Sequence, residues 1–493
     1  MRIRFVMRFS SEEGALAFPR CEEPRRQVGR RYPDDGRRTA PPCAVAPFVA
    51  PAPGLRAAVV QPQRFVPVDA ARGQLAHTGP VLPPTATRDA RTLLFTRGAR
   101  GFADGVVSVL LASYLARLGF TAVQIGAIVT ATLLGSAALT LAIGLAGHRF
   151  RRRAVLLGAA ALMVVTGLGF AGVTSFWPLL AVAFVGTVNP SAGDVTLFLP
   201  TEQAVLAEAA ESRDRTGLFA WYNLTGTFAG AAGALAAGFP DAAAQRFGIE
   251  AAQAERAGFL LYSVLGLVAA VAYARLSPAI EHDTSAPAQP LARSRGIVLK
   301  LSALFSLDSF GGGFVVQSLL VLWLFRRFAL PVQVAGAIFF AAGLLAALSQ
   351  FVAARLAARI GHVRTMVFTH LPANVFLLLA GLMPTAPLAV LFLLLRMSLS
   401  SMDVPARQAY VMAMVPREER AAASSVTNVP RSLAAALSPL LAGILLDRTS
   451  FGWPLLCAGA LKALYDLLLF RQFAHLRPAE EPGEAGSQRS SLR

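Results

Sequence analysis

The chain has 493 residues, of which 55% are hydrophobic and 15% are charged, and its formal net charge is +18. Soluble proteins carry about a quarter charged residues, so this composition excludes an ordinary soluble enzyme, a disordered protein and a secreted disulfide scaffold. The three cysteines, Cys21, Cys43 and Cys457, lie too far apart in the sequence for a local metal or redox motif. We therefore expect neither a metal nor a cofactor.

Residues 1–90 differ in composition from the rest of the chain. They hold 13 of the 31 prolines and no long apolar run. Acidic residues such as Glu12 and Glu13 argue against a transit peptide, which would be poor in acids. Two interpretations stay open: a disordered cytoplasmic tail, or translated sequence from upstream of the true start.

Long apolar runs fill the chain from about residue 102 to 475. A helix that crosses a membrane needs about 20 mostly apolar residues and satisfies its own backbone hydrogen bonds. The sequence therefore predicts an all-α membrane protein. The predicted spans are 102–120, 122–147, 154–174, 177–199, 216–238, 256–275, 298–325, 332–357, 365–383, 386–403, 421–446 and 453–473.

The basic residues predict the orientation of these spans. If the amino terminus is cytoplasmic, the inner loops and the carboxyl tail carry 20 Lys and Arg, against 6 in the outer loops. Such a bias is typical of cytoplasmic loops, so both termini are predicted to be cytoplasmic in an inner, or cell, membrane. Arginines spread over short loops do not form the basic patch of a nucleic-acid-binding protein, and we expect no such partner.

The two halves of the chain carry an internal repeat. Gln124 matches Gln333 at an offset of 209, while Pro200, Gln203 and Asn223 match Pro405, Gln408 and Asn428 at an offset of 205. Because these matches are polar residues or prolines in constant order, they predict two pseudo-symmetric six-helix bundles at residues 91–275 and 298–475. Residues 276–297, which are polar and rich in proline, are predicted to be a cytoplasmic linker, and residues 476–493 a disordered tail.

These features resemble the major facilitator superfamily of secondary transporters. The family signature G-x-x-x-D-R-x-G-R-R falls between spans two and three, where this chain reads GLAGHRFRRR over residues 144–153. His148 replaces the acid and Arg151 the second glycine, and the second-half copy keeps Arg359 and Gly361. The stretch from Arg396 to Tyr410 also resembles one branch of uncharacterised bacterial members.

The resemblance implies that this signature loop has a gating role on the cytoplasmic face. The loop arginines also fit a purely topological role, as anchors at the inner leaflet. We name as candidate gating residues Arg149, Arg152, Asp194, Arg359 and Arg407. Gly226, Gly230 and Gly233 in span five are similar to part of a motif of drug/proton antiporters, or they allow close helix packing.

Charged residues inside the predicted spans are the best candidates for a transport pathway, because such burial is costly and marks function. Asp104 and Asp308 lie near the inner ends of spans one and seven. Arg396 and Asp403 are seven residues apart in span ten, on one helix face but too far apart to pair. The predicted pathway residues are Asp104, Asp308, Gln317, Arg396 and Asp403. The alternative for Asp104 and Asp308 is structural pairing with arginines such as Arg97 or Arg100.

Three further ionisable residues inside the predicted spans have a structural interpretation. Lys462 and Asp466 are spaced i,i+4 in span twelve and are predicted to neutralise each other. His370 in span nine is interpreted as a structural residue with satisfied hydrogen bonds rather than a proton shuttle.

The sequence predicts a secondary active transporter of a small solute by alternating access, with proton-coupled export one possible mode and no enzymatic activity. No P-loop is present, so this chain does not hydrolyse ATP to drive transport. The expected partners are a small-molecule substrate, protons and the lipid bilayer, and we expect a monomer. The rival interpretation is a polytopic membrane protein without transport, such as a receptor, a lipid-handling protein or an assembly factor.

Overall fold

The computed structural model describes residues 86–146, 150–191, 197–209, 215–281, 291, 294–416 and 419–473. All regular structure in these segments is helical, and none of them contains a strand. The helices are α2 (Arg88–Arg117), α3 (Ala122–Ala146), α4 (Arg152–Gly172), α5 (Phe176–Val185), α6 (Leu199–Glu208), α7 (Arg215–Ala236), α8 (Phe239–Phe247), α9 (Ala251–Ala274), the 3-10 helix η2 (Pro278–Glu281), α10 (Arg295–Gly313), α11 (Gln317–Phe328), α12 (Val332–Ile360), α13 (His362–Leu382), α14 (Ala386–Ser400), α15 (Asp403–Met414), α16 (Arg420–Arg448) and α17 (Trp453–Phe473).

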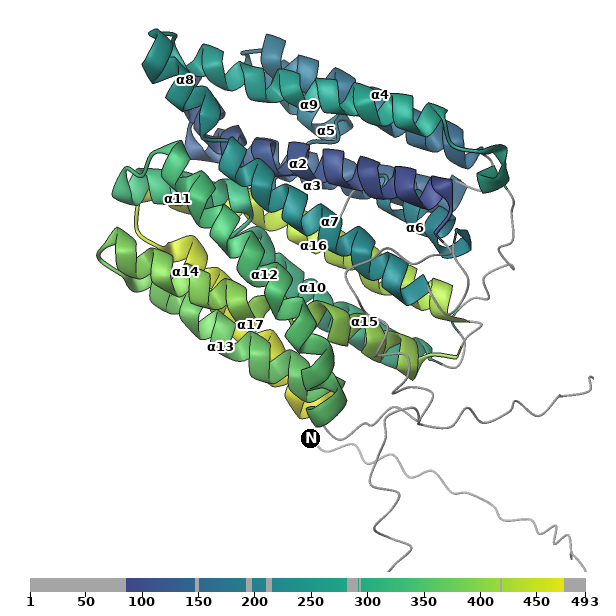
Figure 1. Ribbon diagram of the computed structural model, residues 1–493. Helices are drawn as coiled ribbons and strands as arrows, with labels where there is room; N and C mark the ends of the chain where they lie inside the picture. The colour runs from purple at the N-terminus through teal and green to yellow at the C-terminus, as the bar shows by residue number, and fades with distance from the viewer. Residues whose placement is uncertain are drawn as a thin grey trace, which may run out of the picture. The chain divides into compact units, whose positions relative to one another are not determined.

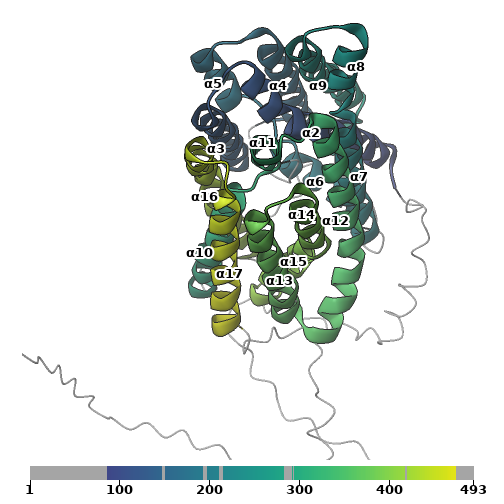
Figure 2. The ribbon, with the colours of Figure 1, turned by 90° about the vertical axis from the view of Figure 1, so that its left-hand side faces the viewer.

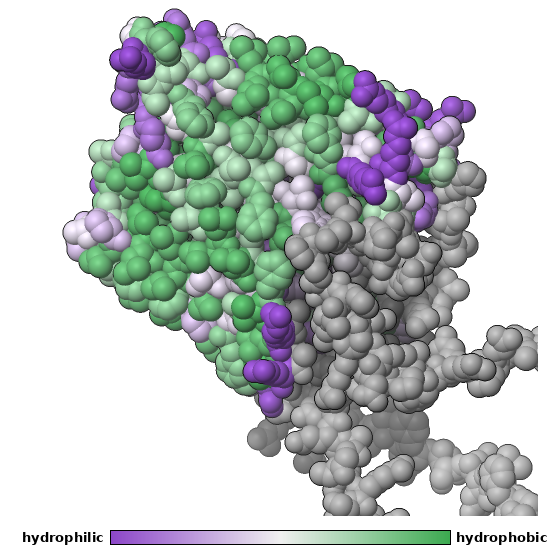
Figure 3. Space-filling model, viewed as in Figure 1, coloured by the Kyte–Doolittle hydropathy of each residue, from purple (hydrophilic) through white to green (hydrophobic). Residues whose placement is uncertain are grey.

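Ten helical segments of the described chain are long and apolar enough to cross a membrane. The short apolar helix α5 and the 22-residue helix α7 complete the predicted twelve spans. Figure 3 shows an apolar surface between polar residues gathered at both ends of the helices. Val264, Leu267 and Phe351 are among the large apolar side chains that are exposed, as a lipid-facing surface requires. The all-α membrane fold is thus confirmed.

Equivalent helices of the two halves pack in equivalent ways. In the first half α2 packs on α7 and α9, and α4 packs on α9; in the second, α10 packs on α16 and α17, and α13 packs on α17. Figure 2 shows most first-half helices above and most second-half helices below, with α7 beside α12 and α16 beside α3. The pseudo-symmetry predicted from the repeat is therefore present in the fold.

Glycines allow the close contacts between the halves. A Cβ on Gly126 of α3 would lie 2.5 Å from the Pro439 carbonyl oxygen of α16, and one on Gly336 of α12 would lie 2.5 Å from the Ala234 carbonyl oxygen of α7. Gly126 and Gly336 occupy matching positions of the repeat, 210 residues apart. The two contacts between the halves are therefore related by the same symmetry as the helices.

Span one begins earlier than predicted. Helix α2 starts at Arg88 rather than near residue 102, so Asp104 lies midway along it instead of near its inner end. Four arginines in the first half of α2 hid this start in the sequence. Arg97 and Arg100 among them are buried, and Arg100 is matched by a buried acid. Asp308 likewise lies well inside the span formed by α10 and α11.

Three predicted spans are interrupted rather than continuous. Span seven leaves the helix at residues 314–316, directly after Gly311–Gly313, where a Cβ on Gly313 would collide with the Ala435 carbonyl of α16. Spans four and ten break into α5 and α6 and into α14 and α15, so the predicted end of span four at residue 199 is wrong. The break at residues 401–402 also separates Arg396 from Asp403, which do not share one helix face as predicted.

The glycines of span five serve close packing. Gly105 of α2 lies against the backbone of Gly230, and a Cβ on Gly233 would lie 2.0 Å from the Phe102 carbonyl oxygen. A Cβ on Gly226 would collide with the guanidinium of Arg97. Close packing thus accounts for Gly226 and Gly233, whereas a Cβ on Gly230 would lie 3.5 Å from the Gly101 carbonyl oxygen, an ordinary contact.

Candidate functional site

The molecule has two ends, which we name after helices that lie there (Figure 1). The α8 end holds α8, the end of α2 and the start of α12. The α6 end holds α6, α15 and the start of α2 and α10. Each half has a cluster of buried charged side chains that involves its first helix, α2 or α10, and the first half also holds the buried acids Asp241 and Glu255 beside Arg117.

Asp308 is the centre of the second-half cluster. Its carboxylate accepts a hydrogen bond of 2.6 Å from the Lys462 ammonium of α17 and one of 3.4 Å from the Arg407 guanidinium of α15. Arg407 lies 3.2 Å from Asp403 as well. Gly311 and Gly312 lie against the Lys462 side chain, so their missing Cβ atoms make room for it. Asp308, Arg407 and Asp403 are all buried, which makes this an ion-pair network that bridges three helices.

A histidine connects Asp308 to a second acid. The Nε2 atom of His370 on α13 lies 3.7 Å from Asp308, and its Nδ1 atom lies 3.0 Å from Asp466 on α17. The Asn374 amide donates to Asp466 at 2.8 Å. The predicted neutralisation of Lys462 by Asp466 is therefore wrong, because Lys462 is bound to Asp308 instead. His370 is hydrogen-bonded as predicted, and besides Asn374 it contacts two ionisable groups, Asp308 and Asp466.

Arg396 lies beside this network without joining it. It is half-buried on α14, and Nη1 contacts the Met397 sulfur at 3.2 Å. Asp308 and Asp403 act on it electrostatically, yet no described acid lies within ion-pair distance and its Nε has no hydrogen-bond partner among the described residues. Its guanidinium thus retains capacity to bind an oxygen-bearing group.

The first-half cluster is organised around Glu202 of α6, which sequence analysis missed. Arg100 of α2 forms an ion pair with Glu202, and the Tyr222 hydroxyl donates to the same carboxylate. Tyr273 donates to it at 2.6 Å and Thr96 at 3.2 Å. Glu202 is fully buried and saturated with donors, so this cluster holds α6 on α2, α7 and α9.

The two clusters place opposite charges at equivalent positions. The repeat offset of 205 that relates Pro200 to Pro405 aligns Glu202 with Arg407. The contacts of Gly105 with Gly230 and of Gly313 with Ala435 align α2 with α10 at an offset of 208, which places Arg100 opposite Asp308. An Arg–Glu pair in the first half therefore corresponds to an Asp–Arg pair in the second. The polar matches around Pro200 were the signal that could have identified Glu202.

Two predicted pathway residues lie apart from the second-half network. The buried Asp104 is near Arg97 and Arg100 and makes no hydrogen bond or ion pair with another described residue. Gln317 is half-buried in the first turn of α11, next to Ser318, whose N–H donates to the Pro190 carbonyl of the first half. The structure thus brings together Asp308 and Asp403, with Arg396 beside them.

The predicted gating residues have different environments. Arg149 and Asp194 lie outside the described residues. Arg152 forms a bidentate ion pair with Glu208 of α6 at 2.7 and 3.0 Å, whereas Arg359 is exposed at the end of α12. Arg407 is not a loop residue as predicted but is buried in α15, within the Asp308 network.

The sequence matches the Major Facilitator Superfamily twice, over residues 93–326 and over residues 301–492. The chain belongs to the Major Facilitator Superfamily. The first match covers the first half and continues into α10 and α11, and the second match begins in α10 and covers the rest of the second half. This superfamily member is a membrane transporter with helices that are long and apolar enough to span a membrane.

Curated and solved proteins agree with this assignment. The uncharacterised membrane protein YJR124C of Saccharomyces cerevisiae is 26% identical over 423 residues, 79% of this chain and 94% of that protein. The xylose transporter XylE from E. coli has a TM-score of 0.62 at 14% identity, covering 78% of this chain and 96% of that one. A bacterial homologue of the lysosomal transporter Spinster, in an inward-facing conformation, has a TM-score of 0.60 at 13% identity over 80% and 98%. The bacterial branch suggested by residues 396–410 remains a prediction.

Proposed function

We propose that this protein is a secondary active transporter that moves a small solute by alternating access. The observation that carries the proposal is the combination of two repeat-related halves with ionisable side chains buried among the helices of each half. Such halves can move against each other as rigid bodies and expose a central site to one side at a time. Buried intramembrane charges are retained where a pathway needs them.

The described contacts support a conformation that is closed at the α8 end. The hydrogen bonds between the halves include Asp241–Gln333 and Ala122–Asp447 at that end, and Thr130–Leu440 and Pro190–Ser318 deeper in the molecule. At the α6 end, α6 packs on α2, α4 and α7, and α15 on α12, α13 and α16, each within its own half. With the predicted orientation, this conformation faces the cytoplasm.

We further propose that protons drive transport through the second-half network. Histidine and carboxylate side chains are groups that bind and release protons, and here Asp308, His370 and Asp466 form one continuous chain. When a proton moves among these three side chains, the strength with which Asp308 binds its partners changes. The charged and titratable groups that face it are Arg396, Asp403, Arg407, Lys462 and Tyr465.

A proteoliposome assay with an imposed pH gradient tests this function. We expect at least one small solute to accumulate or leave in response to the gradient, in the direction that identifies symport or export. Collapse of the gradient by a protonophore should abolish the response. Transport that ignores the gradient would overturn proton coupling alone, whereas a complete lack of flux would favour the rival, a polytopic protein without transport.

The substrate proposed here carries an anionic or carbonyl group that binds Arg396. Arg396→Gln removes the charge-assisted hydrogen bonds, so we expect the affinity for the transported solute to fall about tenfold or more. The measurement is the concentration for half-maximal uptake. Arg471→Gln, which changes an exposed arginine in the last turn of α17, is the matched control and should leave the affinity unchanged. Equal effects of both substitutions would contradict a substrate contact by Arg396.

The remaining topological assignments are also proposals. We place bundles at residues 91–275 and 298–475, joined by a cytoplasmic linker at 276–297, and both termini on the cytoplasmic side of the cell membrane. The basic residues of the predicted inner loops support this orientation. We propose a monomer that binds no nucleic acid.

A further inference from the structure

Two pairs of charged residues occupy equivalent positions at the α8 end. Arg117, in the last turn of α2, lies 3.1 Å from Asp241 of α8. Arg326, in the last turn of α11, lies 3.6 Å from Asp447 near the end of α16. Arg326 follows Arg117 by the repeat offset of 209 residues, and Asp447 follows Asp241 by 206, one residue more than the offset of 205 that relates Gly238 to Gly443.

Each aspartate also contacts the opposite half of the protein. The second carboxylate oxygen of Asp241 accepts a hydrogen bond of 2.7 Å from the Gln333 amide in the first turn of α12. Asp447 accepts one of 3.2 Å from the backbone N–H of Ala122, the first residue of α3. In both places an aspartate is paired with an arginine of its own half and also binds the start of a helix in the other half. The helix dipole favours negative charge at that position.

Matching glycines make these contacts possible. A Cβ on Gly238 would lie 2.9 Å from the Gln333 Cα, and one on Gly443 would lie 2.4 Å from the Ala122 carbonyl oxygen. Gly238 and Gly443 match at the offset of 205. A side chain at either position would push the aspartate's segment away from the opposite helix.

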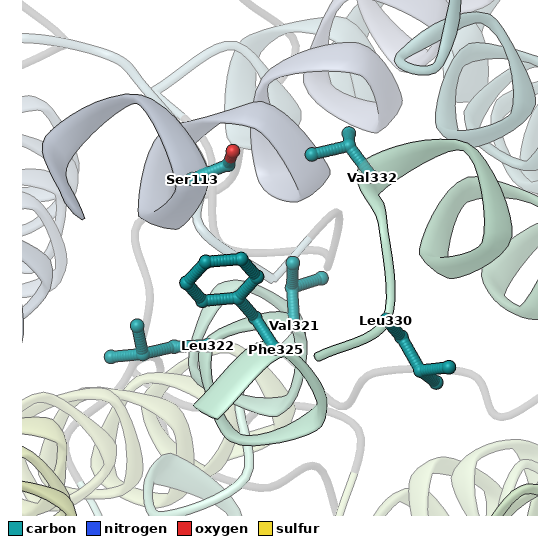
Figure 4. A pocket seen from close by; sticks show the side chains of 6 residues that line it. All are labelled: Ser113, Val321, Leu322, Phe325, Leu330 and Val332. Carbon is teal, nitrogen blue, oxygen red and sulfur yellow. The ribbon is translucent and has the colours of Figure 1, made fainter. Parts of the chain in front are cut away.

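The space beneath these contacts is filled. Figure 4 shows a pocket between α2 and α11 that is lined by Ser113, Val321, Leu322, Phe325, Leu330 and Val332. Its volume is about 10 Å³, enough for about one water molecule. Val106 and Val109 of α2 pack in one apolar cluster with Val321 of α11 and Ala335 of α12. The described residues of α2, α11 and α12 are therefore closely packed at this part of the interface between the halves.

We propose that Arg117–Asp241–Gln333 and Arg326–Asp447–Ala122 are two symmetry-related latches that hold the α8 end closed. The proposal rests on the proposed alternating access, because opening this end requires both latches to separate. The latches differ in burial: the Asp241 side chain is 8% exposed and the Asp447 side chain 35%. The Asp241 latch is therefore the stronger of the two, since water screens it less.

Thiol labelling of purified protein in detergent tests the latch. The three native cysteines are replaced by serine, and Ala335→Cys supplies one buried reporter at the interface between the halves. We expect Gln333→Leu to raise the rate of maleimide labelling about fivefold or more, because it removes the bond to Asp241 and leaves the Arg117–Asp241 pair intact. Gln333→Glu keeps the side-chain size and should raise the rate further through repulsion of Asp241.

Gln124→Leu is the matched control. Gln124 occupies the equivalent repeat position in α3, but among the residues that the structure describes its side chain bonds only the Thr121 N–H of its own half, so its substitution should leave the labelling rate within about twofold of the parent. A Gln333→Leu rate within twofold of the Gln124→Leu rate would overturn the proposal. Labelling needs no substrate, so a lack of flux in proteoliposomes would count against the proposed transport and not against the latch.

Discussion

Glu202→Gln is expected to lower the free energy of unfolding by about 3–5 kcal/mol, because it leaves the Arg100 guanidinium buried without its acid. Arg100 is 1% exposed and Glu202 is fully buried, so water cannot replace the lost charge. Tyr222 and Tyr273 would also lose the charged acceptor of their hydroxyl hydrogen bonds. The measurement is an unfolding titration in mixed micelles, in which the loss of the helical signal reports unfolding.

Two variants separate this effect from a general sensitivity of α6. Glu208→Gln changes the same residue type on the same helix, but Glu208 is 34% exposed and its ion pair with Arg152 is near the surface. It should cost less than about 1 kcal/mol. The double variant Arg100→Leu/Glu202→Gln removes both charges, keeps an amide oxygen that can accept from the tyrosine hydroxyls, and should recover most of the stability lost by Glu202→Gln. A Glu208→Gln cost as large as that of Glu202→Gln would contradict the assigned role of the buried pair.

The repeat could be read from the sequence because its polar matches are independent of the apolar composition. Pro200 with Pro405 and Gln203 with Gln408 fixed the register of α6 and α15, and the packing of the halves follows it. The helical class and the number of spans followed from apolar length alone. This part of the fold is set by local composition and needs no knowledge of contacts.

The charged clusters were less visible for a physical reason. Hydropathy counts a buried arginine or glutamate as a polar residue. Arg97 and Arg100 therefore made the predicted span one too short. For the same reason Glu202 was placed in a predicted loop. Lys462 and Asp466 looked like a local pair at i,i+4, but each has a stronger partner from another helix, Asp308 and His370 respectively. Pairing between helices depends on tertiary packing, which spacing along one helix cannot report.

Broken spans were a second limit. Spans seven and ten read as continuous apolar runs, but the helix of each is interrupted. Span seven is interrupted where it packs closely against a neighbouring helix, and span ten where it places buried charges. Gly311–Gly313 signalled the break in span seven, and Gly313 does abut α16. Span ten gives a weaker signal, because Ser401 and Met402 are ordinary helix residues, and the break becomes evident only from the buried positions of Asp403 and Arg407.

Asp308→Asn is expected to reduce proton-driven transport about 100-fold or more. The substitution removes the acid that Lys462, Arg407 and His370 all face, and with it the group that ties α10 to α15 and α17. Lys462 would then remain buried without its carboxylate, which also destabilises the fold by about 3–5 kcal/mol. The measurement is solute flux driven by an imposed pH gradient, together with the free energy of unfolding.

A second substitution distinguishes proton coupling from folding. In Asp308→Asn/Lys462→Gln the acid and its main partner are neutralised together, so the uncompensated charge disappears while Arg407 keeps Asp403 at 3.2 Å. Stability should return to within about 1 kcal/mol of the parent. Proton-driven flux should stay low, because no carboxylate remains at position 308 to exchange a proton with His370. If flux returned together with stability, Asp308 would be a structural residue and the proton would have to travel through another group.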